Sequence, residues 1–415
     1  MDSFTQMTLG AAVGEAVLGK KAGNRAMLWG AIAGTIPDLD VLSNYFTDDL
    51  TALAFHRGLT HSFLFAVAAP FLYAWLVDRF YKSGLYQQKL YKGSMTAIWL
   101  LVYVFLCYSF YNILSSTGET LGFAYFRNCT IIGIIFAALL IWGFFRTKPL
   151  QEKISKKEWY WLFFWATITH PLLDSCTSYG TQLFQPFWDY RVAFNNISVV
   201  DPIYTVPFLL CVIVAGFLTR TGKNRRIFNY LGIGLSSVYL LSTFHNKYKI
   251  NQVFEASLAK QEIVYKRYMT TPSIFNNILW QGVAEGDTAY YHGLYSFLDE
   301  KEEVLKFSVI PKNHHLVDPY QEQRAMEVLR WFSNDYYNVI VREDGRLQLN
   351  DIRFGSTGDS FEGENDYVFR FILEEKDGEL EANQTREGSA PSGRAFSEFF
   401  RRVAGVDKNG NLKDE

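Results

Sequence analysis

The chain has 415 residues, enough for two domains, and its formal net charge is −2. With a pI near 6.4, this near-neutral balance argues against a nucleic-acid-binding surface, so no nucleic-acid partner is expected. The mean hydropathy of −0.01 averages two unlike parts. Residues 1–244 contain long apolar runs and residues 245–415 are a polar mixture, so we expect a membrane-embedded domain followed by a soluble one.

The first part begins with two short apolar stretches, residues 1–19 and 27–36, which are rich in small side chains. They predict either a hairpin across the membrane or a pair of segments embedded only partly. Six further apolar runs follow, most of them as long as the roughly 17–25 residues that cross a hydrocarbon core. They are residues 62–77, 95–113, 129–145, 159–173, 199–219 and 227–244. Because a membrane segment must satisfy its own backbone polar groups, this part is predicted to be mainly α, a polytopic transmembrane helical bundle.

The links between these runs alternate in charge. Three links, residues 79–92, 146–157 and 220–226, are rich in Lys and Arg, whereas the links between them hold a single Arg each. Positively charged loops stay in the cytoplasm, so the links with a single Arg are expected outside. The last run starts from a positive link, which predicts that the C-terminal domain is extracytoplasmic.

Histidine and aspartate, the usual ligands of zinc and similar divalent metals, recur in three short motifs. The motifs are Pro37–Asp40 (PDLD), His56–Ser62 (HRGLTHS) and His170–Asp174 (HPLLD). His170 and Asp174 are four residues apart, so on a helix they share one face. One such motif alone could be a side chain that caps a helix. All three fall at the predicted outer face, so we expect them to meet around one or two metal ions.

Three other polar residues of the apolar part stand out, and two of them have two interpretations. Glu15 lies inside an apolar stretch, where a carboxylate is costly and usually functional, but a helix-packing hydrogen bond fits equally well. Arg57 could hold a phosphate bidentately or neutralise the carboxylates near it. Arg191 has Asp189 close by in an outward link, which is typical of a surface ion pair.

Hydrolysis is the chemistry that these ligand types favour. A divalent metal with an open coordination position lowers the pKa of bound water enough to form hydroxide near pH 7. Asp38 or Asp40 would act as the base, and Arg57 would hold a phosphate. Nothing in the sequence resembles a GxSxG elbow, a Walker loop or a dinucleotide fingerprint. Two alternatives stay open: a membrane transporter or metal-ion carrier, and a non-enzymatic scaffold with a structural metal.

Five segments in this order resemble the YdjM-type family of bacterial membrane-bound, metal-dependent hydrolases: LGAAVGEAVLGKK, GTIPDLD, HRGLTHS, HPLLDSCTSYGTQLFQPF and DPIYT. The resemblance covers residues 1–220 and extends to TPSIFNNILW. It implies an integral, multi-pass protein of the bacterial inner membrane with hydrolase activity. The His/Asp pattern is also similar to that of zinc-dependent phospholipases C. That distant likeness implies one or two divalent metal ions, with zinc as the first choice. It also implies a membrane lipid or lipid-linked phosphoester as the substrate.

Carried over residue by residue, the resemblance implies six metal ligands: Asp38, Asp40, His56, His61, His170 and Asp174. The chain departs from the family pattern at Gln6, where many relatives have a histidine. Glutamine binds zinc poorly, so either this ligand is dispensable, or the metal site is smaller, or Glu15 compensates.

The polar part alternates short β-like runs with turn signals. Leu279–Phe297, Asn338–Phe354 and Tyr367–Asn383 each have alternating flanks around a Gly-containing turn, which predicts three β-hairpins. Gln321–Ser333 and Ala395–Val403 are predicted helices. We therefore expect residues 245–415 to form a small α+β domain with an antiparallel sheet.

Overall fold

The computed structural model describes residues 1–115, 132–135, 137–139, 141, 143, 153–356, 360–385, 393–407 and 411–412. The chain divides into two compact units. One is Phe71–Tyr160, and the other joins Met1–Pro70 to Trp161–Glu415. All three His/Asp motifs belong to this second, larger unit.

The chain begins with a tight helical hairpin, α1 (Ser3–Ala22) and α2 (Asn24–Ala33), joined at Gly23 with φ +61°. The two helices touch through glycines. A Cβ on Gly10 would lie 2.2 Å from the carbonyl oxygen of Gly30, and one on Gly14 would lie 2.1 Å from that of Ala26. Such close backbone contact between small residues four apart is typical of helix packing in membranes.

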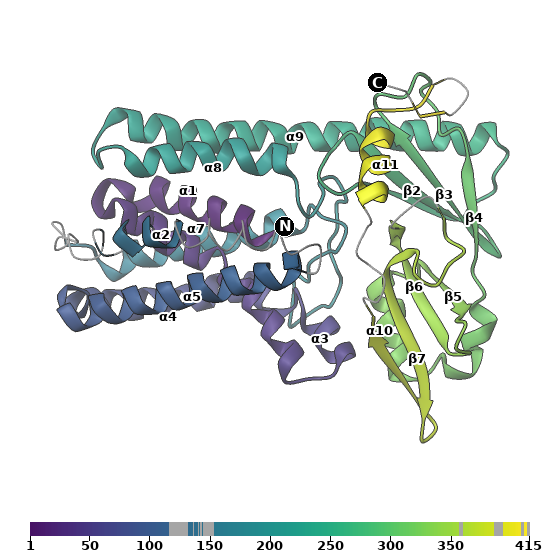
Figure 1. Cartoon of the computed structure of the whole chain (residues 1–415), viewed down its shortest axis with the longest axis horizontal. Coiled ribbons are helices and arrows are strands. Elements are labelled where there is room, and N and C mark those ends of the chain that lie inside the picture. The colour runs from purple at the N-terminus through teal and green to yellow at the C-terminus, as the bar shows by residue number, and fades with distance from the viewer. Residues whose placement is uncertain are drawn as a thin grey trace. The chain divides into compact units, whose positions relative to one another are not determined.

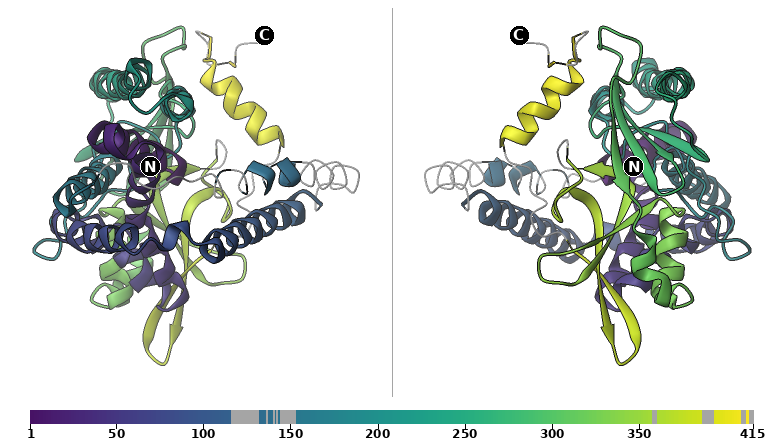
Figure 2. Two further views of the ribbon diagram at one scale, coloured as in Figure 1. Left: turned by 90° about the vertical axis from the view of Figure 1, so that its left-hand side faces the viewer. Right: turned by 90° about the vertical axis from the view of Figure 1, so that its right-hand side faces the viewer.

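Two further helices, α8 (Pro202–Phe217) and α9 (Lys223–Lys260), run beside each other (Figure 1) and both contact α1 (Figure 2). A buried ion pair ties α9 to α1, because Arg225 donates from Nε and Nη2 to the Glu15 carboxylate at 2.7 and 2.6 Å. The structure thus gives Glu15 the helix-packing role.

The N-terminal region is mainly helical, and two of its described helices are long and apolar enough to cross a membrane. These are α4 (Phe63–Lys82) and α9, and α8 is a shorter apolar helix. Two other predicted runs fall within α5 (Lys89–Ser115) and α7 (Lys156–Asp174). The predicted run at 129–145 lies largely outside the described residues. The full polytopic bundle therefore stays a prediction.

The C-terminal region is rich in β-strands and contains two antiparallel sheets of four strands each. The first sheet is β1 (Arg267–Pro272), β2 (Leu279–Glu285), β3 (Ala289–Ser296) and β4 (Phe307–Pro311). The second is β5 (Tyr337–Val341), β6 (Leu347–Ser356), β7 (Tyr367–Lys376) and β8 (Glu379–Gln384). The three predicted hairpins are present as β2–β3, β5–β6 and β7–β8. The predicted helices correspond to α10 (Arg324–Ser333) and α11 (Gly393–Val403).

Helix α9 does not stop at the expected domain boundary after residue 244. It continues to Lys260, and its buried side chains Phe254 and Leu258 pack with Trp280 of the first sheet. Its last third is polar on the exposed side, which is why the sequence loses its apolar character there although the helix goes on.

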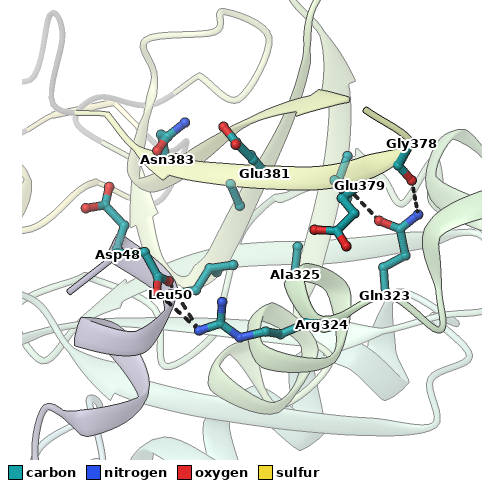
Figure 3. Close-up of a pocket in the computed structure, with 12 residues that line it drawn as sticks. Asp48, Leu50, Gln323, Arg324, Ala325, Gly378, Glu379, Glu381 and Asn383 are labelled. Carbon is teal, nitrogen blue, oxygen red and sulfur yellow. Dashed lines mark hydrogen bonds and ion pairs between the residues drawn. The ribbon is translucent and has the colours of Figure 1, made fainter. Parts of the chain in front are cut away.

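The second sheet packs against α10 and also against α3 (Asp49–Phe55), the short helix between the first two His/Asp motifs. Leu50 and Leu53 of α3 are buried in this core. At the rim, Arg324 Nη2 lies 3.2 Å from Asp48 Oδ1 (Figure 3), and Asp49 accepts a hydrogen bond from the Gln384 amide at 2.9 Å. The C-terminal region therefore holds the segment that carries two of the motifs.

Candidate metal centre

Four side chains from the three motifs converge on one buried point. They are Asp38, His61, His170 and Asp174, and each offers one donor atom within 4.8 Å of the others. Asp38 lies on η1 (Ile36–Tyr45), a 3-10 helix that follows α2, and His61 ends the short 3-10 turn η2 (Leu59–His61). His170 and Asp174 lie one turn apart at the end of α7. The side chain of Asp38 is 19% exposed, and the other three are fully buried.

Five of the six separations between these donor atoms are close to those around a tetrahedral metal ion, and the sixth, between the two carboxylates, lies within 4.8 Å. His61 Nε2 lies 3.1 Å from His170 Nε2, 3.6 Å from Asp38 Oδ1 and 3.4 Å from Asp174 Oδ2. His170 Nε2 lies 3.4 and 3.6 Å from the same two carboxylate oxygens. Ligands held about 2.0–2.1 Å from zinc in a tetrahedron lie about 3.3 Å from one another. Asp174 Oδ2 is buried, and the Arg57 guanidinium forms an ion pair with it, with Nε at 3.0 Å.

Hydrogen bonds behind the two histidines fix which nitrogen faces the centre. His170 Nδ1 donates to the carbonyl oxygen of Gly34, at the end of α2, at 2.6 Å. His61 Nδ1 lies 3.3 Å from Asp40 Oδ2. With both Nδ1 atoms occupied as donors, both Nε2 lone pairs are directed into the cluster, which is the usual arrangement of metal-binding histidines.

Both carboxylate oxygens of Asp40 accept hydrogen bonds from neighbouring groups. Oδ1 accepts from His56 Nδ1 at 2.8 Å, and Oδ2 accepts from the Arg57 amide at 2.8 Å and from Thr60 at 3.2 Å. The ring of His56 is 31% exposed and its centroid lies 6.3 Å from that of His61. Asp40 and His56, two of the six expected ligands, thus lie behind the four-donor cluster.

The other oxygen of Asp174 and the space around it are filled by hydrogen-bond donors. Gln6 Nε2 donates to Asp174 Oδ1 at 2.8 Å, and the α-ammonium group of Met1 donates to the same oxygen. Arg57 Nε lies 3.0 Å from Oδ2, and Nη1 donates to Thr177 at 2.8 Å. Gln6 therefore orients a donor carboxylate and is not itself among the four donors.

The concentrated negative charge alters the acid–base behaviour of the metal-free site. Burial opposes the charged form of His61, but the carboxylates of Asp174, Asp38 and Asp40 outweigh this and raise its pKa to about 10. Burial also opposes ionisation of Asp38 and Asp40, yet hydrogen bonds from the histidines hold the pKa of each carboxyl below its usual range. Burial raises the pKa of the nearby Cys176 thiol to about 11, and this thiol is not among the four donors of the cluster.

Three residues at this site were not singled out from the sequence. Gly34 contributes a backbone carbonyl, which no side-chain pattern reveals. Thr60 lies inside the HRGLTHS motif, and its position between two histidines was the available signal. Tyr179 packs its ring against both His56 and Arg57, at centroid distances of 5.1 and 5.0 Å.

One protein family matches the part of the chain that carries this site. The sequence model described as YdjM inner membrane protein matches residues 1–114 and 129–250, a range that contains all four donors and the residues behind them. No curated protein and no solved structure matches the chain. Since the match covers more than half of the chain, the chain belongs to the YdjM inner membrane protein family.

Proposed function

We propose that this protein is a membrane-bound, metal-dependent hydrolase that cleaves a phosphoester at the outer face of the inner membrane. The observation that carries the proposal is that two imidazole nitrogens lie 3.1 Å from each other and 3.4–3.6 Å from each of two carboxylate oxygens. A divalent metal, with zinc as the first choice, would be held by the four donors His61, His170, Asp38 and Asp174. When bound, such an ion supplies an acidified water and polarises a phosphoryl oxygen.

The neighbouring residues of the chain suit the other tasks of phosphoester hydrolysis. Asp40 holds His56 through Nδ1, so the partly exposed ring is oriented to accept a proton at Nε2. Both oxygens of Asp40 are engaged, and we therefore assign the base to His56 and a positioning role to Asp40. Arg57 Nη2 hydrogen-bonds no residue that the structure describes, and it would donate to a phosphate oxygen.

An apolar rim next to the least buried donor supports a lipid-like substrate. Asp38 lies on η1, and the same element exposes Leu39, Leu42 and Tyr45. Phe46, which follows directly, is 84% exposed. Exposed apolar side chains beside the entrance to a polar site favour an amphiphile from the bilayer over a water-soluble substrate.

The proposed arrangement in the membrane extends the inner-membrane assignment. We propose a multi-pass protein in which the three His/Asp motifs and the C-terminal region lie outside the cytoplasm. The alternation of Lys- and Arg-rich links supports it, and so does the contact between α3 and the second sheet, which keeps the motifs on the side of that region.

A structural metal is the second candidate, because four protein ligands fill a tetrahedral coordination shell and structural zinc sites are closed in this way. In that case the protein would be a scaffold whose C-terminal region binds partners. Transport of a metal ion has less support, since the cluster lies at the end of α7 and next to 3-10 turns, not in the middle of an apolar helix.

Metal analysis of the purified protein tests the proposal. We expect the wild-type protein to contain a divalent metal and His170→Ala and Asp174→Ala to lose it, because each removes one of four donors. His315→Ala, at an exposed histidine of the C-terminal region, is the matched control and should keep the metal. Equal metal content in all four proteins would contradict the proposal.

Activity separates the two candidates that bind metal. With a fluorescent phospholipid in mixed micelles, we expect hydrolysis by wild type and His315→Ala and none by His170→Ala. A metal-loaded wild-type protein that hydrolyses no phosphoester would favour the scaffold.

A further inference from the structure

The loop that follows the donor Asp174 forms one wall of a separate cavity of about 380 Å³. The opposite wall comes from the C-terminal region, within the same compact unit. Aromatic side chains dominate the lining, among them Tyr179, Trp188, Trp331 and Tyr336. A volume of this size and a lining of aromatic groups with a few polar ones are typical of sites for small molecules.

Arg191 brings an uncompensated positive charge to this cavity. It was expected to pair with Asp189, but no ion pair joins Arg191 to any carboxylate in the described part of the chain. Its Nε, Nη1 and Nη2 donate only to carbonyl oxygens, those of Tyr179, His56 and Gly180, at 3.2–3.4 Å. Burial, with Arg353 and Arg57 nearby, lowers its pKa to about 10.

The other charged groups of the cavity do not neutralise the positive charge of Arg191. Arg353 is neutralised by Asp351, whose Oδ2 accepts from its Nη2 at 2.6 Å, and Arg267 is neutralised by Glu285 at 2.5 Å. Asp189 lines the cavity with an exposed carboxylate. The Arg191 guanidinium also lies over the rings of Tyr179, Trp331 and Phe332, at 4.8–5.3 Å from their centroids. A largely buried guanidinium that has only aromatic rings and long carbonyl contacts around it is suited to receive an anion, and its planar fork matches a phosphate.

The cavity lies one layer of side chains away from the metal centre. The ring of Tyr179 contacts two guanidinium groups, with Arg191 Cζ at 4.8 Å and Arg57 Cζ at 5.0 Å from the ring centroid. Arg57 in turn lies 3.0 Å from the donor Asp174. A substrate with a second anionic group beyond its scissile bond would therefore find a partner for each end.

We propose that this cavity is a binding site for a phosphate-bearing headgroup, held by Arg191 and packed against the aromatic walls. The role of this site in the reaction rests on the proposed hydrolase function, because the headgroup would belong to the substrate that is cleaved at the metal centre. The shared chemistry is a phosphate group on an organic residue, from a lipid or from a soluble phosphate ester.

Calorimetric titration of the full-length protein in detergent tests the site without reference to activity. The probes are phenyl phosphate, as the soluble source, and dihexanoyl phosphatidic acid, as the lipid source. We expect at least one to bind, and Arg191→Gln to bind it at least tenfold more weakly, because a charge-assisted hydrogen bond is lost. Asp189→Asn, which removes a negative charge from the lining, should bind about two- to fivefold more tightly. Arg346→Gln, at an exposed arginine outside the cavity, should bind like wild type.

The outcomes also separate this site from the metal centre. Arg191→Gln should keep the wild-type metal content, since Arg191 touches none of the four donors. A wild-type protein without metal that still binds the phosphate would overturn the hydrolase proposal and leave the phosphate site standing. No binding of either probe, or equal affinity in wild type, Arg191→Gln and Asp189→Asn, would overturn the phosphate site. If Arg191→Gln fails to fold, the opposite shift in Asp189→Asn decides.

Discussion

Two aspartates only two residues apart, Asp38 and Asp40, have different tasks in this site. Asp38 directs Oδ1 at both histidine Nε2 atoms, whereas Asp40 binds His61 from behind through Nδ1. The 3-10 geometry of η1 makes this division possible, because residues two apart point in clearly different directions. Asp38 is a donor, and Asp40 holds a donor and the proposed base.

This difference gives a prediction for isosteric variants. Asp40→Asn keeps all four donors but replaces one acceptor by an amide donor, so metal affinity should fall by about 10–100-fold while saturating metal still binds. Asp38→Asn removes a donor and should abolish stoichiometric binding. Competition with a chelator of known affinity measures both. Equal losses in the two variants would show that Asp40 is itself a ligand.

At the residue level, the sequence allowed the types of ligand to be predicted. It did not show which of the six candidates are donors and which lie behind the donors. His61, His170, Asp38 and Asp174 were all among the six candidates. Nothing in the spacing of HRGLTHS separates His61, which faces the centre, from His56, which faces Asp40 and Tyr179. That choice depends on the positive φ of Arg57, +56°, which turns the chain between them.

The close packing of α1 on α2 at their glycines helps to position the metal centre. Gly34, the last of them, supplies the carbonyl that orients His170, and a Cβ on it would lie 2.7 Å from the backbone oxygen of Gln6. The close approach of the two helices therefore brings Gln6 and the Gly34 carbonyl to the same side of the site.

Adding one methyl group to this contact should be costly. In Gly30→Ala the new Cβ would lie 2.1 Å from the carbonyl oxygen of Gly10, so the helices must separate, and we expect a loss of about 1–3 kcal/mol or more. Gly234→Ala in α9 is the control, because its Cβ meets open space and alanine favours a helix by up to about 1 kcal/mol. Thermal unfolding in detergent should show a lower midpoint only for Gly30→Ala.

The elements were predictable from sequence to different degrees. The three β-hairpins could be predicted because a local pattern of alternation and turn residues determines each of them; in β7–β8 the turn residues Asp377 and Gly378 both have positive φ. The end of α9 could not be predicted. Its last turns pack against the first sheet and do not face lipid, so hydropathy gives no signal for them. The contact of α3 with the second sheet joins residues as far as 335 positions apart, Asp49 and Gln384, and has no local signature.

For the molecule as a whole, α3 links the metal centre to the C-terminal region. The chain leaves Asp40, passes through α3 and returns at His56, so both ends of α3 connect directly to residues of the site. Leu50 and Leu53 anchor α3 in the core of the second sheet together with Leu329 and Phe332. Tyr179 adds a second connection, because its ring contacts both His56 and Phe332, at centroid distances of 5.1 and 5.2 Å.

If this link matters, a core cavity far from the donors should loosen the metal. Leu53→Ala should cost about 2–5 kcal/mol of packing energy and free α3 to move, so that His56 and the η1 carboxylates are held less firmly. Leu258→Ala, the same change in the core between α9 and the first sheet, lowers stability without touching α3. We expect faster release of metal to a chelator from Leu53→Ala than from Leu258→Ala at matched temperature below both unfolding transitions. Equal release rates would mean that the C-terminal region stabilises the protein without controlling the site.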